Sequence, residues 1–271
     1  NQWCQEPRPT SAQQYGHIST WDVSQITDMS SLFNNKTNFN DDISGWDTRS
    51  VTDMSSMFEG AINFNQDIGS SPTWNVSYVT SMNSMFKGAT SFNNGDVDSL
   101  KNWYTINVTD MGSMFEGATS FNQDLTGWTT DNVTKMGRMF ANGIFNKDIS
   151  GWETESVQDM SYMFYLNLSF NNGDDGDNGD HPLTWTTSSV TTMKAMFYNA
   201  NTFNQNVSSW NTQLVNDLSY MFSRATKFNN GQAVGQSSAA LNWNLQSVTT
   251  LVHMFSYTPI FNQGIGTWDT D

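Results

Sequence analysis

The chain has 271 residues, and its 26 acidic side chains against 11 Lys and Arg give a formal net charge of −15. So few basic residues exclude the usual nucleic-acid binder, because phosphate neutralisation needs Lys and Arg in quantity, and they disfavour docking on an anionic membrane. No apolar run approaches the roughly 18 residues of a membrane-spanning helix. The 18 Phe, 15 Met and 11 Trp are too many for an unfolded chain, so the protein folds.

Residues 1–17 do not fit the pattern that governs the rest of the chain. We expect this segment to be a lead-in or a cap, with Trp3 covering the first coil of the repeat array that begins at residue 18. Cys4 is the single cysteine, so the chain contains no internal disulfide, and we expect a free thiol.

Residues 18–271 are one array of repeats. Each repeat reads W-x-[VTIL]-x-x-[VI]-x-x-[ML]-x-x-[ML]-F, followed by a second Phe, an Asn and the next Trp. Nine repeats of 24–33 residues fit, and a tenth starts at the last Trp. The tryptophans that mark the starts are Trp21, Trp46, Trp74, Trp103, Trp128, Trp152, Trp185, Trp210, Trp243 and Trp268.

The large apolar residues are confined to fixed columns of the repeat. Two columns, represented in repeat two by Phe58 and Phe64, hold all 18 Phe of the chain. A coil this short cannot bury its own apolar face, so neighbouring coils must stack on it. The Asn after the second Phe, Asn65 in this repeat, recurs nine times. We expect it to form a ladder that satisfies backbone groups between coils, because buried amides need partners.

Local spacing predicts one strand and one helix in each repeat. Residues 43–48 are short, partly β-branched and bounded by turn residues, which favours a strand. Between Val51 and Ala61, apolar residues recur at intervals of three, four and seven, which is typical of a helix that ends near Gly60. The predicted fold class is α/β: a leucine-rich-repeat-like solenoid of nine coils, with parallel strand stacking and an Asn/Phe ladder.

The repeated motif resembles a known family. Val51–Ala61 followed by Phe64–Ile68, and again Val108–Met111 with Phe121–Leu125, are similar to the BspA-like leucine-rich-repeat surface proteins, also described as mycoplasma-lipoprotein-type repeats. The resemblance covers about residues 18–271. It implies a leucine-rich-repeat solenoid that is secreted or displayed on a cell surface, with a role in adhesion and no catalytic residues.

Four repeats are longer than the others, and the extra residues always lie between the Phe-Asn pair and the next Trp. Three of these extensions begin with Asn-Asn-Gly, and Asn-Gly favours a tight turn with positive φ. We expect a row of loops on one side of the array, as either a binding surface or tolerated insertions. In repeat three, the candidate ligand-binding residues are Asn94, Asp96 and Asp98.

The extension of repeat six is strongly acidic. Asp174, Asp175, Asp177 and Asp180 are interleaved with Gly, and closely spaced carboxylates on a flexible loop are what a calcium ion prefers. The spacing differs from that of an EF-hand. The alternatives are a calcium site and a solvated acidic loop; no other cofactor is expected.

Two tyrosines stand at a position that other repeats fill with Ser, Ala, Arg or His, namely Tyr162 and Tyr220. Exposed there, they could stack on sugar rings or fill a protein interface. The alternative is that they widen the packing between coils.

Nothing in the sequence pairs a nucleophile with a base. The three histidines, His17, His181 and His253, are dispersed, and no glycine-rich phosphate loop is present. We therefore expect a non-enzymatic extracellular or cell-surface protein that mediates adhesion, or binds a protein or polysaccharide ligand, through its edge loops. The alternative is a structural protein that self-associates head to tail through an uncapped C-terminal end, forming a filament or coat.

Overall fold

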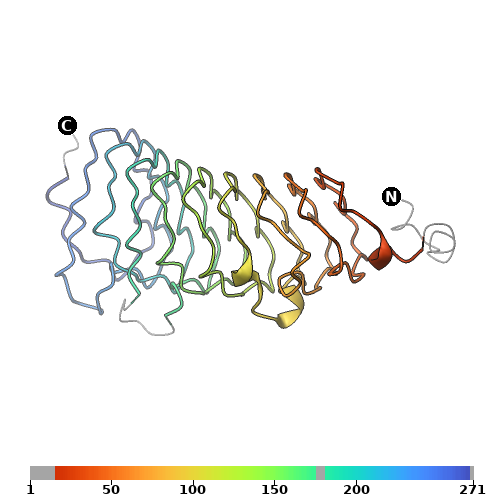
Figure 1. Cartoon of the computed structure of the whole chain (residues 1–271). Coiled ribbons are helices and arrows are strands. Elements are labelled where there is room, and N and C mark those ends of the chain that lie inside the picture. Colours follow the sequence, from red (N-terminus) through yellow and green to blue (C-terminus); the bar gives the residue numbers. More distant parts are fainter. Residues whose placement is uncertain (1–15, 175–180, 269–271) are drawn as a thin grey trace.

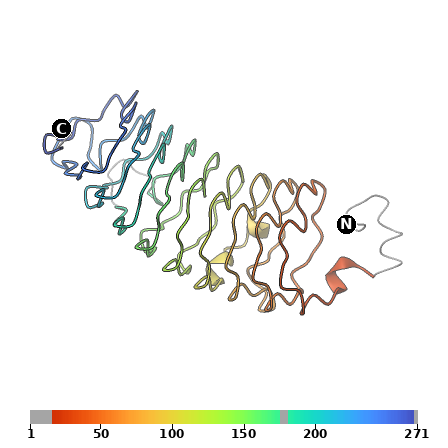
Figure 2. The same cartoon turned by 90° about the horizontal axis from the view of Figure 1, so that it is seen from above.

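The computed structural model describes residues 16–174 and 181–268. The chain winds into an elongated stack of coils, one coil for each repeat, and the first and last described coils lie at opposite ends (Figure 1). Seen from above, the coils follow one another along a single axis (Figure 2). The predicted cap, residues 1–17, lies almost wholly outside the described ranges, as do Trp3 and Cys4.

The predicted α/β architecture is wrong. The described residues contain no α-helix, and the helices they do contain are three short 3₁₀ turns, η1 (Ile18–Thr20), η2 (Asn94–Asp96) and η3 (Leu100–Asn102). None of these helices is long and apolar enough to cross a membrane. In place of a sheet, these residues form isolated parallel bridges, one between each pair of neighbouring coils, as from Asp28 to Asp53.

The segment predicted to be a helix is a run of tight turns. The Met57 amide donates to the Met54 carbonyl at 3.2 Å, and the Ala61 amide donates to the Phe58 carbonyl at 3.0 Å. The third residue of each turn, Ser56 and Gly60, has a φ of 53° and 67°, as in type II turns. Successive turns place apolar side chains three and four residues apart, as a helix does, so the spacing could not tell the two structures apart.

The amides between these turns bond to the next coil. In coil two, the N–H groups of Met54, Ser56 and Phe58 donate to carbonyls of coil three at 2.8–3.1 Å. Alternate N–H groups therefore close a local turn or reach the neighbouring coil. A helix would need the same groups for its own i−4 carbonyls, so the stacking bonds exclude it.

The two Phe columns form the core. Phe58 and Phe64 of one coil stack with centroids 4.0 Å apart, and Phe58 stacks on Phe86 of the next coil at 5.4 Å. All Phe side chains are at most 3% exposed except Phe255 and Phe261 in the last coil, which are half-buried. Each ring thus completes the burial of the ring before it.

The expected asparagine ladder is present. The side-chain oxygen of Asn40 accepts the amide of Asn65 at 2.9 Å, Asn65 accepts Asn93 at 2.8 Å, and Asn93 accepts Asn122 at 3.0 Å. The same bond continues through the remaining coils to Asn262. Each Asn therefore satisfies a backbone group that the bend leaves without a carbonyl partner.

Many acidic residues have a structural role in turns. Asp53 accepts the amide of Ser55 at 2.7 Å, and Asp159 accepts that of Ser161 at 2.8 Å. These are Asx turns, in which a side chain replaces a backbone acceptor two residues away. Part of the negative charge of the chain is therefore explained by its turns.

Candidate binding site along the extension loops

The extensions of repeats two and three lie next to one another on the side of the stack that carries η2 and η3 (Figure 1). They comprise residues 69–73 and 94–102. The extensions of repeats six and eight begin at 172 and 230, and residues 175–180 of repeat six lie outside the described ranges.

The three Asn-Asn-Gly sequences form the tight turns that the sequence predicts. In repeat three, Asn94 and Gly95 have φ angles of 53° and 63°, and the amide of Asp96 donates to the carbonyl of Asn93 at 3.0 Å. Two successive positive φ angles are typical of a type I′ turn. The turns at Asn172 and Asn230 have the same signs of φ and the equivalent bond.

The second Asn of each turn fixes the loop to the scaffold. Asn94 is fully buried, and its side-chain oxygen accepts the amide of Ile68 in the preceding coil at 2.9 Å. Its Nδ2 donates to the carbonyl of Val97 at 2.7 Å and to Ser99 Oγ at 2.8 Å. Asn172 and Asn230 are buried and accept amides in the same way. Asn94, a candidate ligand-binding residue, therefore lies inside the protein and supports the loop.

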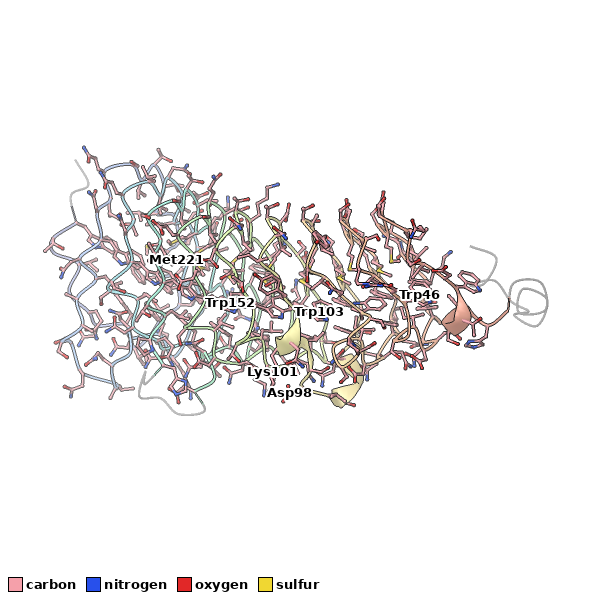
Figure 3. The ribbon with its side chains drawn as sticks, in the orientation of Figure 1. Trp46, Asp98, Lys101, Trp103, Trp152 and Met221 are labelled. Carbon is pink, nitrogen blue, oxygen red and sulfur yellow. The ribbon has the colours of Figure 1, made fainter. Side chains whose placement is uncertain are left out.

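The two candidate aspartates of repeat three have different hydrogen-bond partners. Asp96 accepts Nδ2 of Asn93 at 2.8 Å within its own turn. Asp98 accepts the amide of Asp124 in the next coil at 3.1 Å, and Lys101 forms a 3.4 Å ion pair with the Asp124 carboxylate. Figure 3 shows Asp98 and Lys101 at the same edge of the stack. The structure therefore links Asp98 to the scaffold.

Asp67 joins the extensions of repeats two and three. Its carboxylate accepts the amides of Gly69 at 3.1 Å and Ser70 at 3.0 Å, and the hydroxyl of Ser99 at 2.8 Å. Burial raises the energy of the charged form, but the hydrogen bonds outweigh burial and lower the pKa of Asp67 below its usual value. One carboxylate thus holds two loops together.

Of the four aspartates proposed for calcium, only Asp174 is described. Its amide donates to the carbonyl of Asn171 at 3.1 Å, and its carboxylate accepts Nε2 of Gln205 at 3.3 Å. Asp175, Asp177 and Asp180 lie outside the described residues. Elsewhere in the described ranges, no three His, Cys, Asp or Glu side chains come together as metal ligands would. The calcium site stays a prediction.

The two tyrosines take part in a chain of ring contacts. Arg138 lies over the Tyr162 ring at 4.3 Å, and Tyr162 meets Tyr165 edge to face at 5.6 Å. Tyr220 is 36% exposed and lies 5.1 Å from the ring of His253. These rings contact neighbours in the protein, so a ligand would meet them with part of their surface already covered.

A hollow of about 220 Å³ opens between the extension of repeat two and the end of that of repeat three. Residues 69–72, 74–77 and 102–104 line it, and none of the lining side chains is charged. We call it the Trp74 hollow. Tyr104 on its wall is 57% exposed, whereas Trp74 and Trp103 are 3% exposed.

The Trp74 hollow was not predicted from the sequence, although the repeats carry a signal for it. The third residue of most repeats after the first is Thr, as in Thr48 and Thr105, but repeat three has Val76. Leu245 of repeat nine departs from the column in the same way, but the tryptophan stack continues there, so the departure indicates the hollow only together with the contacts of Trp74.

Comparison with known proteins places the chain in a family. The profile of the family described as "Mycoplasma protein of unknown function, DUF285" matches residues 8–100, 96–182 and 176–271. The chain therefore belongs to this family, and it is a repeat protein. No curated protein and no solved structure matches it.

Proposed function

We propose that the chain is a non-enzymatic protein of the cell surface or exterior that mediates adhesion by holding a macromolecular ligand on its extension loops. The resemblance of the repeated motif to BspA-like surface proteins supports this placement. The observation that carries the proposal is the way the loops are fixed. Buried Asn94, Asn172 and Asn230 each bond a backbone amide of the preceding coil.

A loop fixed in this way is suited to binding. Ordering a mobile loop costs free energy on association, and a loop already ordered by its scaffold avoids that cost. The extensions add length at one position of the repeat only, so they gather on one side of the stack while the core columns stay intact. Protruding loops on a rigid scaffold are a common form of binding surface.

Loop exchange tests the proposal. Residues 93–102 and 229–242 would each be replaced by residues 204–209, the short connection of repeat seven. Adhesion would be measured on plates coated with mucin, fibronectin or, as a blank, albumin. We expect the parent chain to bind one coated surface and the exchanges to weaken binding, with Arg49→Ala, an exposed site outside the exchanged segments, as the control. Equal binding by parent and exchanged chains with intact melting curves contradicts the proposal.

The last described coil favours a second candidate, head-to-tail association. In earlier coils, alternate amides donate to the next coil, but the equivalents at Leu251, His253, Phe255 and Tyr257 donate to no described residue. At the other end, the carbonyls of 28, 30, 32 and 34 accept no hydrogen bond from a described residue. A row of donors at one end could therefore meet a row of acceptors on a second copy.

Charge supports the same association. Residues 228–268 contain no Asp, Glu, Lys or Arg, although the whole chain carries −15. Proteins commonly protect exposed backbone edges with charged side chains, and residues 228–268 lack them. Light scattering over a concentration series tests the proposal: mass should grow with concentration, and Val252→Lys with Tyr257→Lys should prevent growth. A constant monomer mass rules out self-association.

A further inference from the structure

Three regular contacts between coils are missing at repeat three, two at its boundary with repeat four and one at its boundary with repeat two. The first is the tryptophan stack. Rings of consecutive coils lie 6.0–6.5 Å apart, as for Trp46 with Trp74 and Trp103 with Trp128. Among the described residues, no such contact joins Trp74 to Trp103. The boundary between Trp152 and Trp185 shares this break but keeps the hydroxyl contact of Thr154.

The second missing contact is an indole hydrogen bond. Trp74 is 3% exposed, and its Nε1, which by its place in the column faces the coil of repeat two, has no hydrogen-bond partner among the described residues. Eight other tryptophans of the column donate to a carbonyl of the preceding coil, at 2.6–3.4 Å. A buried donor without an acceptor is costly, and such a group calls for an explanation.

The third missing contact involves a threonine hydroxyl. Thr105 donates to the carbonyl of Thr129 at 2.9 Å, and the equivalent Thr of five other coils does the same. Val76 stands at this position in repeat three and has no hydroxyl. The carbonyl of Tyr104, which Val76 would otherwise reach, accepts no hydrogen bond from the described residues.

These gaps coincide with the Trp74 hollow, whose wall carries Trp74, Val76 and Tyr104. The wall therefore combines an unpaired backbone acceptor with apolar surface and with the hydroxyls of Ser70 and Ser77, while Nε1 of Trp74 is buried behind it. Absence of charge in so acidic a chain disfavours a cation, a phosphate or a charged peptide as the ligand. With about 220 Å³, the hollow is smaller than the ~300–1,000 Å³ of sites that hold drug-sized molecules.

We propose that the Trp74 hollow binds one sugar unit of an uncharged glycan. A sugar ring offers an apolar C–H face to aromatic surface, and hydroxyls that both donate and accept, which matches the mixed wall. The Tyr104 carbonyl takes a sugar hydroxyl in place of the missing threonine, and the exposed Tyr104 ring covers the ring face. This inference rests on the proposed adhesive function and names the ligand class at one part of the loop row.

Affinity electrophoresis and calorimetry with mannan, dextran and laminarin test the inference, with polygalacturonate as the charged counterpart. Val76→Thr restores the residue that other coils use, and its hydroxyl would occupy the Tyr104 carbonyl. We therefore expect about a tenfold loss of affinity for the glycan. Tyr104→Ala should cause a similar loss. Tyr78→Ala is the matched control, because Tyr78 is 65% exposed and does not line the hollow.

The outcomes separate this inference from the proposed function. Binding to none of the neutral glycans, or full binding by Val76→Thr, overturns the sugar site. Mucin binding that survives enzymatic deglycosylation and is lost on loop exchange points to a protein ligand, so the loop proposal stands while the sugar site falls. Unchanged melting of Val76→Thr shows that the loss comes from the site, since the substitution recreates a contact found in six other coils.

Discussion

Nε1 of Trp128 donates to the carbonyl oxygen of Leu100, one coil earlier, at 2.8 Å. Trp74 occupies the same column but has no such acceptor. Loss of the indole nitrogen should therefore have unequal effects at the two sites. We expect Trp128→Phe to lower the free energy of unfolding by about 1 kcal/mol more than Trp74→Phe, because only the Trp128 indole has a hydrogen bond to lose. Urea denaturation of both variants measures the difference, and equal losses would contradict it.

Gly127 and Gly151 precede the Trp of successive repeats but have different surroundings. A Cβ at Gly127 would lie 2.0 Å from the carbonyl oxygen of Lys101, whereas a Cβ at Gly151 would meet nothing within 4 Å. Gly127→Ala should lower the unfolding free energy by about 1–3 kcal/mol, since backbone must move. Gly151→Ala should be neutral or stabilising by up to about 1 kcal/mol. Thermal melting of the pair tests this, and a harmless Gly127→Ala would mean that η3 can shift freely.

Asn122 is an internal member of the asparagine ladder. Its oxygen accepts the amide of Asn146 at 2.8 Å. We expect Asn122→Ala to cost about 1–3 kcal/mol of unfolding free energy, because that amide loses its partner. Asn122→Asp keeps an acceptor oxygen and should cost less at neutral pH. Chemical denaturation ranks the variants; if Ala and Asp are equally destabilising, the acceptor is not what the column provides.

Asp67 should make stability depend on pH. Burial opposes its ionisation, but hydrogen bonds from Ser70, Ser99 and the Gly69 amide lower its folded-state pKa. A lowered pKa gives stability that is present above the unfolded-state value of about 4 and is lost as the pH falls through the folded-state value. Unfolding free energies at pH 7 and through the acid range should therefore show a smaller acid loss for Asp67→Asn than for the parent. Parallel curves would contradict this role.

The sequence was sufficient to place the core but not the backbone path. The Phe columns correctly identified buried positions such as Phe115, and the Asn column correctly predicted the ladder. The prediction of a helix in place of the tight turns was wrong because an interval of three or four residues suits both structures. The deciding partners, such as the Asn83 carbonyl for the Ser56 amide, lie one repeat away in the chain. Arg138 and Tyr162 are among the residues with positive φ, and Arg and Tyr rarely adopt that conformation, so the sequence did not indicate these turns.

The candidate site was predicted only in outline. Asn-Asn-Gly correctly located the turns that open the extensions, because few residues other than Asn and Gly accept positive φ readily. The burial of Asn94 could not be predicted, since it depends on the amide of Ile68 in another coil. Val76 was visible as a departure from the Thr column, but its meaning depends on the carbonyl of Tyr104, which only the stacked coils bring near it.

Within the run of tight turns, the backbone bonds between coils go from alternate amides of one coil to carbonyls of the next, as from Phe58 to Met85. Every internal boundary thus pairs amides of one coil with carbonyls of the next, and the stack grows longer by one coil with each added repeat. Whole repeats can be gained or lost during evolution without a new core, because each junction re-forms the contacts of the one removed. The number of repeats between two extended repeats then sets the distance between their extension loops. Selection can therefore change the spacing of the loops without changing the loops themselves.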